Sequence, residues 1–233
     1  MNIPPFQFWK KWTRSCAAGE LIGIAAAALL AVGYIRLFGE PSGFWSGLFN
    51  VLVMLLAGAI EGSLLGWFQW RVLRLKFPQL KLSDWMGYTI AVAVLGWAMG
   101  MIPTMLFNNA ASHNQPTNAE VTVSTEPALW LVLLGAAALG LLLGALFGLF
   151  QWLALRRQSP NAQKWILGNA IGWSLAMFWI FLAASIPDAS TPLMLVVGMG
   201  AAGGILAGLS VGAITGLFLL HIDPYFSTVE EDA

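Results

Sequence analysis

The sequence predicts an all-α integral membrane protein that forms a bundle of six transmembrane helices. Of its 233 residues, 58% are hydrophobic and only 9% are charged, which lies far outside the range of soluble domains. The chain also holds six apolar runs of about 20 residues or more, the length that a helix needs to cross a bilayer core about 30 Å thick. These runs are too long and too evenly apolar for the alternating strands of an outer-membrane barrel.

The six expected helices cover residues 19–38, 46–70, 85–107, 127–155, 165–186 and 192–220. The third and fifth helices are expected to end near Pro103 and Pro187, because proline stops or kinks a helix. The first apolar run follows a basic segment, as in a secretory signal peptide. It is long for a cleaved signal, so we expect it to remain as a helix.

The basic residues predict the orientation of the chain. Ten of the 11 lie before the first helix or in the loops that follow the second and fourth helices: Lys10, Lys11, Arg14, Arg71, Arg74, Lys76, Lys81, Arg156, Arg157 and Lys164. The opposite loops hold only Arg36. Because loops rich in Lys and Arg stay in the cytoplasm, both termini are expected there, in a bacterial cytoplasmic membrane or its equivalent.

Glycines recur at every fourth position of the even-numbered helices, which places them on one helical face. The rows are Gly58, Gly62, Gly66; Gly140, Gly144, Gly148; and Gly204, Gly208, Gly212, Gly216. Such rows let another helix approach closely, so we expect helix packing here and place the even helices on the inside. The alternative is that the glycines widen a central pathway for a solute.

These rows are part of a predicted internal repeat. A single membrane domain, 1–233, would consist of three parallel helical hairpins at about 17–75, 84–157 and 164–222, followed by an acidic tail at 223–233. Parallel repeats imply a pseudo-threefold axis along the membrane normal. If Gly216 is aligned with Gly66 and Gly148, the third copy is degenerate, with Leu219 and Leu220 in place of Gln and Trp.

Two nearly identical segments, GWFQWRVLR from Gly66 and GLFQWLALR from Gly148, end the second and fourth helices. Their aromatic and basic side chains suit the headgroup level of the membrane. The candidate contacts to lipid headgroups, anionic ones in particular, are Gln69, Trp70, Arg71, Arg74, Gln151, Trp152, Arg156 and Arg157. The structural interpretation is that these segments stop and orient the helices.

The repeated segment resembles those of uncharacterised multi-pass bacterial membrane proteins that carry one or more QWxxLR motifs. The resemblance rests on Gly66, Gln69, Trp70, Leu73, Arg74 and on Gly148, Gln151, Trp152, Leu155, Arg156. It implies a membrane bundle built from repeats and carries no activity over to this chain.

Glu61 is the one acid that we expect deep inside a span, where a charge is costly and marks a functional residue by default. In the alignment above its counterparts are Leu143 and Val211, so the acid belongs to one hairpin alone. Two interpretations stay open: a site for proton or small-solute transport, and a protonated structural glutamate. A proton relay normally needs several ionisable groups, so a single carboxylate is weak support for proton transport.

No set of residues for catalysis is apparent, so we expect no enzyme and no cofactor. With one cysteine, Cys16, and two histidines, His113 in a polar outer loop and His221, no metal site is expected. The favoured hypothesis is an interaction or assembly subunit that contacts the lipid bilayer and another membrane protein or a second copy of itself, with no nucleic-acid partner. The alternatives are a transporter or channel that uses Glu61, and a lipid-binding role.

Overall fold

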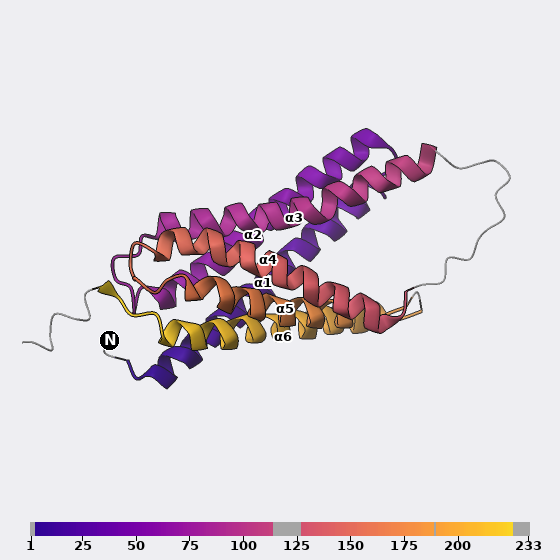
Figure 1. Ribbon diagram of the computed structural model, residues 1–233. Coiled ribbons are helices and arrows are strands. Elements are labelled where there is room, and N and C mark those ends of the chain that lie inside the picture. Colours follow the sequence, from indigo (N-terminus) through magenta and orange to yellow (C-terminus); the bar gives the residue numbers. More distant parts are fainter. Residues whose placement is uncertain (1–2, 114–126, 189, 226–233) are drawn as a thin grey trace, which may run out of the picture.

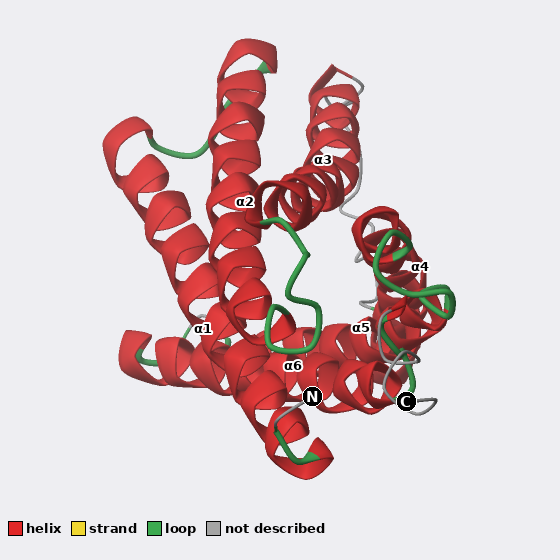
Figure 2. Cartoon of the chain, turned by 90° about the vertical axis from the view of Figure 1, so that its left-hand side faces the viewer, coloured by secondary structure: helices red, strands yellow, loops and turns green. Residues whose placement is uncertain are grey.

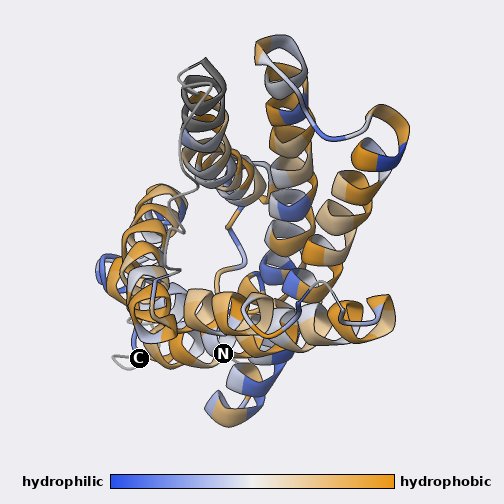
Figure 3. Cartoon of the chain, turned by 90° about the vertical axis from the view of Figure 1, so that its right-hand side faces the viewer, coloured by the Kyte–Doolittle hydropathy of each residue, from blue (hydrophilic) through white to orange (hydrophobic). Residues whose placement is uncertain are grey.

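The computed structural model describes residues 3–113, 127–188 and 190–225, and it is all-α in this part (Figure 1). Its helices are α1 (Pro5–Phe38), α2 (Phe44–Leu73), α3 (Leu82–His113), α4 (Leu129–Leu155), α5 (Lys164–Ala184) and α6 (Leu193–Leu220). All six are long and apolar enough to cross a membrane. Apolar residues predominate along these helices (Figure 3), as expected of a multi-pass membrane protein.

The helices form a ring in chain order, in which each helix packs on its neighbours in sequence and α6 closes the ring against α1 (Figure 2). Both ends of the described chain lie at one end of the bundle, together with the loops α2–α3 and α4–α5 (Figure 1). We call this the termini end. In the described part of the chain the backbones of the even helices do not approach one another, and each even helix lies in the ring between odd helices, so the expectation that the even helices form an inner layer is wrong.

Two helix boundaries differ strongly from the prediction, and the others agree within a few residues. α1 begins at Pro5, well before the apolar run, because Phe8, Trp12 and Cys16 recur at every fourth residue and are buried on one face. α3 continues through Pro103 to His113, so proline does not end it and His113 is not in a loop. Proline removes only one backbone donor, and the remaining hydrogen bonds carry the helix past it. α5 ends at Ala184, shortly before Pro187, as predicted.

Each glycine row lies against the next odd helix of the ring: α2 on α3, α4 on α5 and α6 on α1. A Cβ atom at Gly62 would lie 2.8 Å from the Cβ of Ala93, and one at Gly208 would lie 2.6 Å from the Cα of Ala17. Such separations leave no room for a side chain. The backbones of these helices therefore approach each other closely at every second interface.

The remaining interfaces lie within the hairpins, and they are unequal. A Cβ at Gly19 of α1 would lie 3.1 Å from the Cα of Leu65 on α2, and one at Gly172 of α5 would lie 3.2 Å from the Cα of Val211 on α6. On α3, by contrast, Gly87 and Gly100 face open space. The α3–α4 interface is the least closely packed of the ring.

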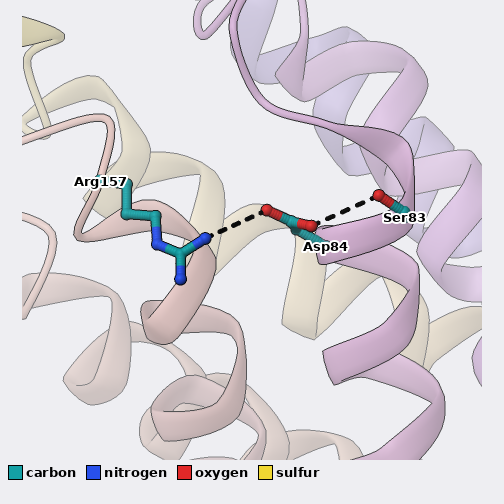
Figure 4. Close-up of polar contacts among 3 residues, drawn as sticks. All are labelled: Ser83, Asp84 and Arg157. Carbon is teal, nitrogen blue, oxygen red and sulfur yellow. Dashed lines mark hydrogen bonds and ion pairs between the residues drawn. The ribbon is translucent and has the colours of Figure 1, made fainter.

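A surface ion pair joins α3 to the segment after α4 at the termini end (Figure 4). The guanidinium of Arg157 lies 3.4 Å from the carboxylate of Asp84, which also accepts a hydrogen bond from Ser83. Both partners are accessible to solvent, Arg157 with 61% of its side chain exposed, so the pair contributes little to stability.

Candidate functional site

A cavity of about 510 Å³ lies inside the ring, lined by residues of α1 to α5. Most of its wall is alanine, glycine, methionine and other apolar residues, with the aromatic side chains of Trp97, Phe147 and Trp173. Two acids, Glu20 and Glu61, also line it. No lysine, arginine or histidine is among the lining residues.

Two neighbouring helices contact the side chain of Glu61 on α2. The indole Nε1 of Trp97 on α3 donates a hydrogen bond of 2.7 Å to the Oε2 of Glu61. On the other side, α1 presents Gly23, where a Cβ would lie only 2.9 Å from the Cγ of Glu61. An indole donor and a missing side chain thus fix where the carboxylate sits, between three helices.

Glu20 on α1 is a second intramembrane acid that the sequence interpretation missed. Its side chain is 2% exposed, and its Oε1 atom has no hydrogen-bond partner among the described residues. Glu20 lies three residues before Gly23, which packs against Glu61, and both acids line the same cavity. The expectation that Glu61 is the one acid deep in a span is therefore wrong.

The signal that would have found Glu20 is helical spacing. Phe8, Trp12 and Cys16 lie four residues apart and are buried in a common core, and Glu20 is the next position in that row. Hydropathy alone predicts that the first helix begins at residue 19, which leaves Glu20 at the edge of the membrane. The earlier start of α1 brings it inside.

The chemistry of this cavity suits a cation. Carboxylates inside a membrane are costly unless they are protonated, paired or hydrated, and they mark ion and substrate pathways. The aromatic side chains of Trp97 and Trp173 also line the cavity, and aromatic rings attract organic cations. A mostly apolar pocket with a few converging polar groups is also the general form of a small-molecule site.

A layer of tryptophans closes the bundle between the cavity and the termini end. Trp12, Trp85 and Trp165, one from each odd helix, are fully buried. The ring centroids of Trp12 and Trp165 are 5.8 Å apart and those of Trp85 and Trp165 are 5.9 Å apart, both in edge-to-face geometry. Aromatic pairs in this geometry stabilise a core beyond the area they bury.

Gln69 and Gln151 take part in this layer. The expectation that they contact lipid headgroups is therefore wrong. They are 2% and 1% exposed. The Nε2 of Gln151 donates to the Oε1 of Gln69 at 3.2 Å and to the Oγ1 of Thr89 at 3.0 Å, and its Oε1 accepts from the Nε1 of Trp165 at 3.0 Å. These amides satisfy one another because no water reaches them.

The other candidate headgroup residues of the two repeated segments lie on the outer side of the bundle. Trp70 and Trp152 are half-buried, and the guanidiniums of Arg74 and Arg156 lie 5.0 and 5.1 Å from their ring centroids. Arg71 lies in the same way over Trp67, at 4.7 Å, and Arg157 pairs with Asp84. All four arginines are exposed at the termini end, so their contact with headgroups stays a prediction.

Lys76, in the α2–α3 loop, is buried against the end of α6, where its Nζ donates to the carbonyl of Leu219. Burial lowers its pKa below the ordinary value of 10.5, and nearby Asp223 opposes this shift. Between the lowered pKa and 10.5 the unfolded chain holds a proton that the folded chain lacks. Stability should therefore rise with pH across that interval and level off above it.

The pH dependence of the melting temperature tests this prediction. We expect Lys76→Met to remove the rise, while Lys81→Met, at an exposed position close by, retains it. Equal slopes for the wild type and Lys76→Met would show that Lys76 keeps its ordinary pKa in the folded protein.

Comparison of the chain with protein-family models, with curated proteins and with solved structures gives no match. The cavity and its two acids are therefore the basis for a functional proposal.

Proposed function

We propose that this chain is a multi-pass membrane protein that binds a small lipophilic cation in its cavity and moves it across the membrane. The observation that carries the proposal is the pair Glu20 and Glu61 on one cavity without a basic residue in its lining. A monovalent organic cation would neutralise one carboxylate, and a proton would neutralise the other. This role requires no catalytic residues, and none are expected from the sequence.

The shape of the bundle supports one-sided access in this conformation. The tryptophan layer blocks the termini end. Away from it, α1 to α3 diverge from α4 to α6 (Figure 1), and the cavity lining extends in that direction to Gly100 and Met101. The loosely packed α3–α4 interface offers a second route, from the lipid.

We further propose that the ring consists of three repeated hairpins with cytoplasmic termini, in a bacterial cytoplasmic membrane. Three equivalent contacts, one for each glycine row, support the repeat: Gly62 lies against Thr89, Gly144 against Asn169 and Gly208 against Cys16. Thr89, Asn169 and Cys16 each stand four residues after a tryptophan of the buried layer. The ten basic residues on one side support the orientation.

These contacts favour an alignment of the third copy that differs by one helical turn from the alignment expected from the sequence. With Gly62, Gly144 and Gly208 equivalent, Gln69 and Gln151 correspond to Thr215, which accepts a hydrogen bond of 2.9 Å from the Nε1 of Trp12. The third copy thus retains a polar group at this position. The counterparts of Glu61 become Leu143 and Ala207 in place of Leu143 and Val211.

Binding of tetraphenylphosphonium to the purified protein, measured by calorimetry, tests the cation site. We expect Glu20→Gln and Glu61→Gln each to weaken binding about tenfold or more, because each removes a counter-charge in a low-dielectric cavity. Glu40→Gln is the matched control, since Glu40 is an exposed acid between α1 and α2. Uptake of the same cation into proteoliposomes under a proton gradient tests movement.

The possible outcomes separate the parts of the proposal. Equal binding by the wild type and the Glu20→Gln/Glu61→Gln double variant, or no binding of tetraphenylphosphonium and tetraethylammonium by the wild type, would overturn the cation site. Glutamate-dependent binding without uptake would overturn transport alone. The interaction or assembly role expected from the sequence stays a prediction, and no contact among the described residues favours a particular partner.

A further inference from the structure

A second hollow, separate from the cavity, lies on the outer surface at the termini end. This groove of about 400 Å³ runs between α1 and α2. Lys11 and Arg14 line it from α1, and Arg71 lines it from the last turn of α2. All three side chains are exposed, and no acidic residue is among the lining residues.

The three positive charges have no counter-ion in the described part of the chain. The ion pair found there, between Arg157 and Asp84, lies elsewhere. Arg71 is held in place by the face of Trp67, at 4.7 Å from its ring centroid, which directs a guanidinium without neutralising it. Like charges that converge on one hollow repel each other unless an anion joins them.

The fold itself does not require this cluster. In the proposed repeat, the second hairpin has Asp84, Gly87 and Leu153 at the positions of Lys11, Arg14 and Arg71, and the third has Lys164, Leu167 and Leu217. Both of these hairpins form with at most one basic residue there. The basic groove is therefore particular to the first hairpin.

We propose that this groove binds the phosphate headgroup of an anionic phospholipid. Its wall changes from Lys11 and Arg14 to the apolar Ala18 and Phe68 toward the middle of the helices, which matches a phosphate followed by acyl chains. Basic pockets at the ends of membrane helices hold anionic headgroups in this manner. Arg71 supplies planar donors for the phosphate oxygens, and the lysine adds a point charge.

Native mass spectrometry of the protein released from nanodiscs of phosphatidylcholine and phosphatidylglycerol, in equal amounts, tests the site. We expect the wild type to retain phosphatidylglycerol. The variant that combines Lys11→Gln, Arg14→Gln and Arg71→Gln should retain about a hundredfold less, from about fivefold per charge. The matched control combines Lys10→Gln, Lys81→Gln and Lys164→Gln, three exposed basic residues outside the groove, and should retain lipid as the wild type does.

Two results would overturn the proposal. Equal retention by the groove variant and the wild type would show that the groove holds no anionic lipid, and equal loss in both variants would show a diffuse charge effect. A third arm adds inorganic phosphate during release: complete displacement of the lipid by phosphate would identify a phosphate ion as the occupant in place of a lipid. Binding of the organic cation is measured separately, so failure of one proposal leaves the other standing.

Discussion

Gly144→Ala should destabilise the folded bundle by about 3 kcal/mol or more, because overpacking forces packed backbones apart. A Cβ at this position would overlap the carbonyl oxygen of Asn169, and it would lie 2.7 Å from the Cβ of Trp173 and 2.9 Å from the Cα of Ala170. Two of these three atoms belong to the backbone of α5, so no flexible side chain can move aside. The free energy of unfolding in mixed detergent micelles is the measurement.

Gly135→Ala is the matched control in the same helix. A Cβ at Gly135 meets no atom within 4 Å, so this variant should be neutral or more stable by about 0.5 kcal/mol, the usual helical preference for alanine. The two substitutions make the same chemical change, but only Gly144→Ala is expected to lower the free energy of unfolding. A similar small effect for both would contradict the close approach of α4 and α5.

Gln151→Leu should cost about 3 kcal/mol, because it leaves several buried polar groups without partners at about 1–3 kcal/mol each. The Nε1 of Trp165 would lose its acceptor and the Oε1 of Gln69 its donor. The indole of Trp85 is already unpaired in this layer, so no spare acceptor is at hand. The same unfolding measurement applies, with the exposed Gln79→Leu as the control.

A double-mutant cycle makes this prediction sharper. Combining Gln69→Leu with Gln151→Leu should cost less than the sum of the two single changes, because the second substitution removes a group that the first left unpaired. Additive effects would show that the two amides do not bond to each other in the membrane-embedded protein.

Much of the repeated segment could be interpreted from the sequence, but the direction of each side chain could not. The spacing correctly placed Gln69 and Trp70 at the end of a helix. Only the ring shows that the glutamine faces inward to Gln151 while Trp70 faces outward beneath Arg74. Adjacent residues of a helix point about 100° apart, and without knowledge of the neighbouring helices either one could have faced the core.

The third glycine row shows a similar limit. The row Gly204, Gly208, Gly212 and Gly216 allows two alignments that differ by one turn. The sequence favours the alignment in which the GLF at Gly216 matches the GLF at Gly148. The contacts of Gly208 with α1 favour the other. Glycines that recur at every fourth position look the same after a shift of one turn. The alignment of this row with the other two therefore depends on which glycine contacts which residue of the partner helix.

The sequence by itself determined the membrane class, the number of helices and most of their boundaries. Hydropathy and length are local properties, and the fixed thickness of the bilayer core requires each spanning helix to be apolar over about 20 residues. It also singled out Glu61, because a charge inside an apolar run is visible without a fold. The tertiary structure alone decided that Glu20 joins Glu61 at one cavity, and that Lys11, Arg14 and Arg71 meet in one groove. These groups lie on two different helices, and only the packing of α1 against α2 brings them together.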